Sequence, residues 1–329
     1  MLENNRLDMR KLLYVVALAF TAVACSKSDQ PAGGGYPADG VVRIRPAVAA
    51  PMTRVEGSTE FSGSRLRLGL YYGENDRYNK TALWKKGADG NWNSSSPVLW
   101  RNAEDEVVVY GFVPDDSSSG YNYGYIAHSE GVPSDQSNGL ERADWLWYSE
   151  KVKPGEALDD SGKLKVEMNH ALLKLTVNLS FGDEFGGTAP AIKEVWLNGT
   201  MQKVYVYYKY ESRGQIIFPT TQLPMDIKMH KASDNCYEAI FYPSSGQMKG
   251  GKMLTVVLAD GREFCLTLAK DLNLEKSSDG NYYLGGCAYS MSVKIGKDKI
   301  GKDKIEMGNI GIYSWQNGSE GNLEAEEKN

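Results

Sequence analysis

Cys25 is the residue of this chain whose position most clearly indicates a chemical role. It follows an apolar run, Leu12–Ala24, which comes directly after the short basic stretch Met9-Arg10-Lys11. That order is typical of a secretory signal starting at Met9, and the run is too short for a stable membrane span. Small residues before the cysteine, in Ala22-Val23-Ala24-Cys25, resemble a bacterial lipobox, so we expect a lipid on Cys25. An ordinary signal with an incidental cysteine is the alternative.

The other candidate chemical groups form no recognisable constellation. The remaining cysteines lack CxxC spacing, which favours buried thiols over a zinc site or a disulfide framework. Residues 246–253 approach a phosphate loop, but Met253 replaces the Ser or Thr and a strand follows instead of a helix. The histidines are far apart in the sequence: His128, His170 and His230. The sequence therefore predicts no enzyme, no metal site and no cofactor.

Charge and aromatic content narrow the classes of partner. The net charge of −5 argues against nucleic acid, which is usually bound through a basic surface. Aromatic residues are frequent, with 20 Tyr and 7 Trp. Five tryptophans lie in the first half of the chain: Trp84, Trp92, Trp100, Trp145 and Trp147. If exposed, they would offer a stacking surface for sugar rings; packing inside a β-sandwich core is the alternative.

Short strand-like segments must position these residues. Each has alternating or continuous apolar character and is bounded by Gly, Asn, Asp, Ser or Pro, as in an all-β sandwich. The clearest are 41–48, 65–72, 106–113, 172–181, 204–210, 214–219, 237–243, 252–259, 262–269 and 288–295. No long segment has helical periodicity, although 143–152 would accommodate one helical turn.

A Gly- and Pro-rich stretch at 182–190 is the best domain boundary in the sequence. We therefore expect a signal peptide over 1–24, a lipidated flexible tether over 25–40, and two β-sandwich domains over 41–183 and 184–329. The second domain ends in a polar, acidic tail.

The order of several motifs resembles the fimbrillin family, the pilin-like lipoproteins of Bacteroidales fimbriae. The most specific is MNHALLKLTVNL, and it is accompanied by Thr53-Arg54 and a closing IGIYSW. Further similar pieces, in chain order, are EFSGSRLRLGLYY, DGNW, PVLW, VVVYGFVPDD, ADWLWYSEKV, AIFYPSSGQ and NYYLGGCAYSMSVKI. The resemblance extends over nearly the whole chain and implies two transthyretin-like β-sandwich domains in tandem.

The resemblance also implies an assembly mechanism. A precursor reaches the outer-membrane surface on its lipid, and an arginine-specific protease removes the lipid with the first strand. The vacated groove then accepts a strand from another fimbrial subunit. On this chain we expect the cut between Arg54 and Val55, with Arg43 and Arg45 as competing sites.

The same resemblance assigns the two strands that take part. The removable strand lies in 41–48 and contains Val41, Val42 and Ile44. The candidate donor strand lies near the C-terminus and contains Ile305, Ile310, Ile312 and Trp315. Other fimbrial subunits, the membrane, and a ligand on a host or bacterial surface are the implied partners. A glycan-binding or fimbria-anchoring lipoprotein that keeps its lipid is the alternative, because the acidic tail cannot fill an apolar groove.

Overall fold

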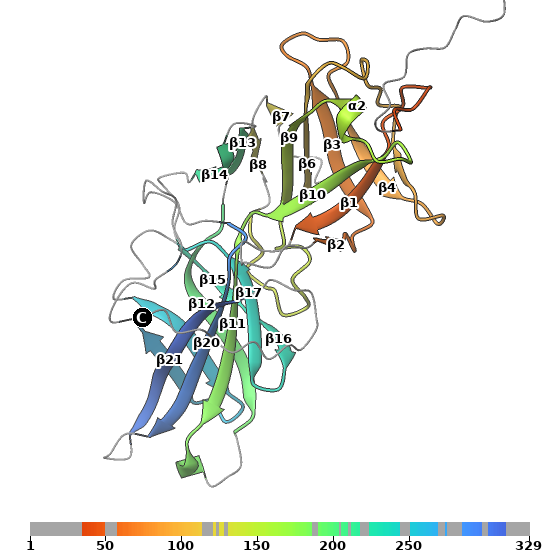
Figure 1. The fold of residues 1–329 in the computed structure, drawn as a ribbon. Coiled ribbons are helices and arrows are strands. Elements are labelled where there is room, and N and C mark those ends of the chain that lie inside the picture. Colours follow the sequence, from red (N-terminus) through yellow and green to blue (C-terminus); the bar gives the residue numbers. More distant parts are fainter. Residues whose placement is uncertain are drawn as a thin grey trace, which may run out of the picture.

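The computed structural model is built almost entirely of β-strands (Figure 1). It describes residues 35–49, 58–113, 121–122, 125–127, 131–185, 190–203, 205–209, 212–217, 224–243, 251–268, 274, 285–297 and 302–313. Helical structure in these ranges is limited to α2 (Pro154–Ala157) and the 3-10 turn η1 (Asp183–Phe185). None of the helices in the described ranges is long and apolar enough to cross a membrane. The all-β prediction is confirmed, and the layout as two transthyretin-like domains stays a prediction.

The first lobe is an eight-stranded sheet in the order β2-β1-β10-β9-β6-β3-β4-β5. Its strands are β1 (Ile44–Ala49), β2 (Ser58–Glu60), β3 (Arg65–Tyr71), β4 (Lys80–Lys86), β5 (Trp92–Ser94), β6 (Val107–Val113), β9 (Leu146–Val152) and β10 (Leu164–His170).

β10 turns the corner between two layers of this sheet. It pairs with β1 over Leu164–Met168 and with β9 only through Asn169 and His170. β1 and β10 consequently cross in front of β3, β6 and β9 (Figure 1). Apolar side chains from both layers, including Ile44 of β1 and Leu68 of β3, form one buried cluster between them.

The second lobe has two sheets, in the orders β16-β17-β11-β20-β21 and β15-β12-β18-β19, with a second cluster of buried apolar side chains. Its strands are β11 (Leu173–Phe181), β12 (Ile192–Met201), β15 (Pro224–Lys228), β16 (His230–Ser233), β17 (Cys236–Phe241), β18 (Lys252–Leu258), β19 (Glu263–Thr267), β20 (Ala288–Lys297) and β21 (Asp303–Tyr313). In each lobe, the first strand runs parallel to a strand near the end of that lobe, β1 to β10 and β11 to β20.

A small sheet in the order β14-β13-β8-β7 joins chain segments that are distant in sequence. Its strands are β7 (Tyr121–Asn122), β8 (Tyr125–Ala127), β13 (Tyr205–Lys209) and β14 (Ser212–Ile217). β8 follows β6 of the first lobe in the chain, and β13 follows β12 of the second, so their pairing connects the two halves.

Two segments assigned by sequence to the first domain pack with the second lobe. β11 hydrogen-bonds to β17 and β20, and Trp145 belongs to the second apolar cluster. Buried Gln136 accepts a bond from Ile240 N at 2.9 Å and donates one to Ile240 O at 2.7 Å. The predicted boundary at 183/184 stays a prediction; we propose that the change of lobe falls between β10 and β11.

Strand β9 was not predicted from the sequence. Residues 143–152 were expected to hold at most a helical turn, but Leu146–Val152 is strand β9, which pairs with β6 along its whole length. Its alternation of buried Leu146 and Tyr148 with less buried neighbours is the strand pattern, which short aromatic runs obscure.

Candidate functional site: the N-terminal strand and its supports

β1 is an inner strand of the first lobe although it comes from the N-terminal end of the described chain. It runs parallel to β10, from the Ile44–Leu164 pair to the Val48–Met168 pair. On its other side it runs antiparallel to β2, where Ala47 pairs with Glu60. Because both edges of β1 are paired, its removal would leave unpaired backbone groups on two neighbouring strands.

The side chains of this segment are an integral part of the first apolar cluster. Val42, Ile44 and Val48 are only 2%, 3% and 7% exposed, and they pack with Val166 and Met168 of β10. Burial of each such side chain stabilises the fold by about 1.5–3 kcal/mol. Removing the strand would therefore open an apolar groove as well as two unpaired strand edges.

Pro46 makes the two edges of β1 unequal. Leu164 N donates to Arg43 O at 2.9 Å. In a parallel strand, the backbone groups of alternate residues bond to the same neighbouring strand. The backbone groups of Arg45 and Ala47 therefore also point to β10, whereas the backbone of Pro46 points to β2. Proline has no N–H to donate, and at this position the ladder retains only the bond from Phe61 N to Pro46 O, at 3.5 Å. β1 is therefore held more completely by β10 than by β2.

The residues just before β1, 35–43, form a second attachment that we call the strap. Gly35 N donates to Asp159 O at 3.2 Å, and Val42 N donates to Val98 O at 2.9 Å. Trp100 N donates to Gly40 O, also at 2.9 Å. Residues 35–40, which we predicted to belong to a flexible tether, are therefore bonded to the first lobe.

The strap contains a turn that is stabilised by its own side chains. Gly40, with a φ of 64°, donates its N–H to Pro37 O at 2.9 Å. Asp39 accepts two bonds from the Arg43 guanidinium, at 3.0 and 2.7 Å, and one from Val41 N at 3.1 Å. The Arg43 hydrogen bond, followed by that from Val41, lowers the pKa of the Asp39 carboxyl to about 2. The Pro-Ala-Asp-Gly sequence at 37–40 is a turn pattern that the sequence analysis missed.

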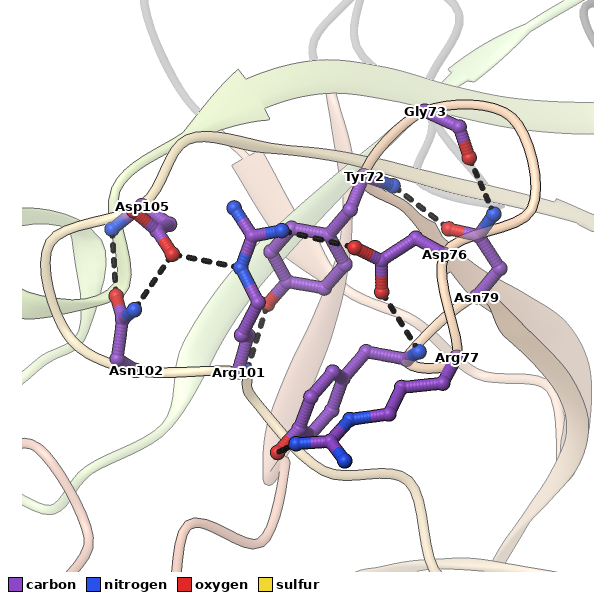
Figure 2. Close-up of polar contacts among 9 residues, drawn as sticks. Tyr72, Gly73, Asp76, Arg77, Asn79, Arg101, Asn102 and Asp105 are labelled. Atoms are coloured by element: carbon purple, nitrogen blue, oxygen red, sulfur yellow. Dashed lines mark hydrogen bonds and ion pairs between the residues drawn. The ribbon is translucent and has the colours of Figure 1, made fainter.

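A polar network holds the chain segment on which the strap lies (Figure 2). Arg101 N donates to the Tyr72 hydroxyl at 3.0 Å, and its guanidinium lies over the Tyr72 ring, 4.7 Å from the centroid. The same guanidinium bonds Asp76 at 2.8 Å and Asp105 at 2.6 Å. Asn102 accepts the Asp105 N–H at 2.7 Å. This network ties the loop after Trp100 to the loop between β3 and β4.

The structure places some of the predicted site residues and not others. Val41 forms an isolated bridge with Leu99, and Val42 and Ile44 are buried as described above. Cys25, Arg54 and Val55 lie outside the described residues, and their assigned roles stay predictions. Gly35, Gly162 and Arg101, which support the strand from outside 41–48, were missed by the sequence analysis.

The candidate donor strand is paired within its own chain. β21 is the last strand of its sheet and pairs with β20 from Lys297–Asp303 to Ala288–Tyr313. Ile305 and Ile310 pack partly buried against the second apolar cluster, and Ile312 is in register with Tyr289. Trp315 lies outside the described residues.

The five tryptophans of the first half of the chain do not form an exposed stacking surface. Trp84, Trp100 and Trp145 are at most 2% exposed, and Trp92 stacks on Phe61 with ring centroids 5.7 Å apart. Core packing, the alternative weighed for these residues, is what the structure shows for the three buried side chains, while Trp92 and Trp147 pack partly buried against the two apolar clusters. Within the described ranges, no group of three or more His, Cys, Asp or Glu is placed to hold a metal ion.

A comparison with models of known protein families identifies the family of this chain. The model of the family described as fimbrillin-like matches residues 53–315. That range contains every described strand except β1. The chain belongs to the fimbrillin-like family.

Solved structures show the same fold at low sequence identity. A candidate cell adhesion protein from Bacteroides uniformis is 16% identical, with a TM-score of 0.57 over 84% of this chain and 100% of that chain. Another, from Bacteroides ovatus, is 13% identical, with a TM-score of 0.54 over 85% of this chain and 99% of that chain. A search of the curated proteins gives no match.

Proposed function

We propose that this chain is a fimbrial subunit of the cell surface, exported as a lipoprotein on Cys25 and assembled by strand exchange after proteolysis at Arg54. Membership in the fimbrillin-like family supports the fimbrial role. The single structural observation that supports strand exchange is the position of β1. It is an N-terminal segment that closes the first lobe from inside a sheet, between β10 and β2.

The described geometry also bears on where the protease would cut. Arg45 lies within β1, in register with Lys165, and Arg43 is bonded through its side chain to Asp39. A protease needs an extended, unpaired segment in its own cleft, and a paired inner strand does not present one. Arg54 lies between β1 and β2 in the sequence, so a cut there would separate β1 from the rest of the chain.

The donor strand requires a rearrangement on this proposal. β21 is bonded to β20 in its own sheet, so the residues 303–313 would have to leave β20 before entering the groove of another subunit. The edge position of β21 favours such a release, because an edge strand has fewer bonds to break than an inner one.

The test starts from the unlipidated chain, residues 26–329, treated with an arginine-specific protease. We expect a stable product whose first residue is Val55, followed by a ladder of oligomers on gel filtration. Arg54→Lys keeps the charge but should abolish this product, while the matched Arg43→Lys should leave it unchanged.

Two other results of this experiment would contradict parts of the proposal. A chain that resists cutting at Arg54 would overturn assembly by processing and leave the anchoring lipoprotein that keeps its lipid. A chain that is cut, releases residues before Val55 and stays monomeric would overturn strand exchange.

A further inference from the structure

Residues 35–42 of the strap occupy a surface that is separate from the groove along β10, and Arg43, which accepts the Leu164 N–H, joins the two. The backbone partners of residues 35–42 are Val98 O, Trp100 N and Asp159 O, which lie in two loops of the first lobe. We call these groups, with the turn Asp159–Lys163, the strap receptor. Val42 adds a buried side chain at its inner end, and Tyr36 packs partly buried against the first apolar cluster.

Glycines make the strap and its receptor fit backbone against backbone. A Cβ on Gly35 would lie 2.7 Å from Asp160 O. A Cβ on Gly162, whose φ is 72°, would lie 2.5 Å from Gly35 O. Real side chains do not tolerate such approaches, so the two glycines permit a contact that other residues would prevent.

The receptor is built from bonds that do not belong to the strap. Asp159 Oδ1 accepts Ser161 N at 2.9 Å and Lys163 N at 3.0 Å, which shapes the turn. The Arg101 network holds the other loop to Tyr72 and Asp76 (Figure 2). Each of these bonds joins groups outside residues 35–43, so the receptor keeps its shape when the strap leaves.

We propose that the acceptor site of this subunit has two parts, the β10 groove and the strap receptor, and that both are filled by one extended segment of another subunit. The strap itself shows what the receptor takes. The occupant runs parallel to β10, places an apolar residue at the position of Val42, and has a small residue at the position of Gly35 and a glycine at the position of Gly40, whose φ is 64°. The inference rests on the proposed strand exchange and adds a second contact, which would select among donor segments.

Peptide binding to the cut chain tests this inference. The chain is cut after Arg54, the protease is inhibited, and the N-terminal fragment is removed by gel filtration in mild urea before return to buffer. Binding is then measured for two labelled peptides, residues 35–49 and residues 44–49. We expect the longer peptide to bind at least about tenfold more tightly, because it adds the three backbone hydrogen bonds to the strap receptor, the bond from Leu164 N to Arg43 O and a buried valine.

A receptor variant tests the contact directly. Gly162→Ala places a Cβ against the strap at Gly35 and should lower the ratio of the two affinities, without changing the affinity of the shorter peptide. Gly90→Ala is the matched control. Gly90 has a φ of 79°, and a Cβ there meets nothing within 4 Å, so the ratio should stay as in the parent chain.

The outcomes separate the inference from the proposed function. Equal affinity of the two peptides, or an unchanged ratio in Gly162→Ala, would overturn the strap receptor while leaving strand exchange intact. Binding of neither peptide would overturn strand exchange itself.

Discussion

Ile44 illustrates how a single side chain ties the N-terminal segment to the first lobe. It is 3% exposed and belongs to the same apolar cluster as Leu68 and Met168. The next residue, Arg45, points away from that cluster, with 61% of its side chain exposed. Truncation of these two adjacent side chains should therefore lower the free energy of unfolding by different amounts.

We predict that Ile44→Ala lowers the free energy of unfolding of the uncut chain by about 2–5 kcal/mol, because it removes buried methyl groups and leaves a cavity. Arg45→Ala should change it by less than about 0.5 kcal/mol. Urea unfolding followed by tryptophan fluorescence measures both. Equal losses for the two variants would show that β1 is not packed as described.

The strap turn should respond to acid. The pKa of Asp39 is lowered from an ordinary value of 3.8 to about 2, first by its bond from Arg43. A lowered pKa in the folded chain means that the stabilisation is complete above about pH 4 and is lost as the pH falls through about 2.

We predict that the Val41 amide, which donates to Asp39, shows an NMR titration with a midpoint near pH 2 and that Asp39→Asn removes this step. The carboxyl is exposed, so added salt should raise the midpoint toward 3.8. A midpoint already near 3.8 at low salt would contradict the Asp39–Arg43 pair.

At the scale of elements, β21 is the strand whose pairing has the most direct bearing on assembly. Its bonds to β20 are interrupted by an irregularity between the Met291 and Val293 pairs. Ile310 packs against the second cluster, whereas Met307 is 40% exposed. The two positions on one strand provide a matched pair.

We expect Ile310→Asp to cost about 2–4 kcal/mol of unfolding free energy, because a carboxylate would be brought against an apolar cluster. Met307→Asp should change it by less than about 0.5 kcal/mol. Hydrogen exchange of the β21 amides should become faster only in the first variant. If both variants exchange alike, β21 is not held by the packing of Ile310.

Most strands were predictable because their apolar residues alternate or run continuously between turn residues. β3, β6, β11 and β18 lie within one residue of the predicted ranges. β9 was not predicted because Trp147 and Tyr148 are adjacent and therefore point to opposite faces of the strand. Two large aromatic neighbours hide the alternation of apolar and polar residues. β1 was predicted to start at Val41, but regular pairing begins at Ile44, because Val41 and Val42 pair with the loop residues Leu99 and Val98 instead.

At the scale of the whole molecule, the long connection between β6 and β9 joins the two lobes. Val132 N donates to Gln202 O at 2.7 Å, and Lys228 N donates to Ser134 O at 2.8 Å. The buried amide of Gln136 pairs with both backbone groups of Ile240. Part of the chain that belongs to the first lobe in sequence thus completes the second.

We predict that Gln136→Ala lowers the free energy of unfolding by about 1–3 kcal/mol, because it leaves two buried backbone groups of Ile240 without partners. Gln202→Ala truncates an exposed side chain and serves as control. Thermal unfolding should show a loss for the first variant alone. A neutral Gln136→Ala would mean that the connection does not secure the second lobe.

The candidate site was predictable only in its central strand. Alternating apolar residues made Val42 and Ile44 visible, but the strap depends on backbone contacts between Gly35 and Gly162, which are far apart in sequence. The change of lobe that we propose after β10 was also hidden, because β10 and β11 are both apolar strands separated by only Ala171 and Leu172. Only long-range pairing shows which lobe each belongs to.

The parallel pairing of β1 with β10 has a mechanical consequence. A tension applied along β1 from its N-terminal end loads the backbone bonds of the ladder together, in shear, instead of opening them one after another. The strap lies ahead of that ladder and takes the load first, at Gly35, Gly40 and Val42. If Cys25 holds the precursor to a membrane, drag on the rest of the molecule would pull on this junction. On the proposed export route, this pairing would resist the pulling of β1 out of the first lobe.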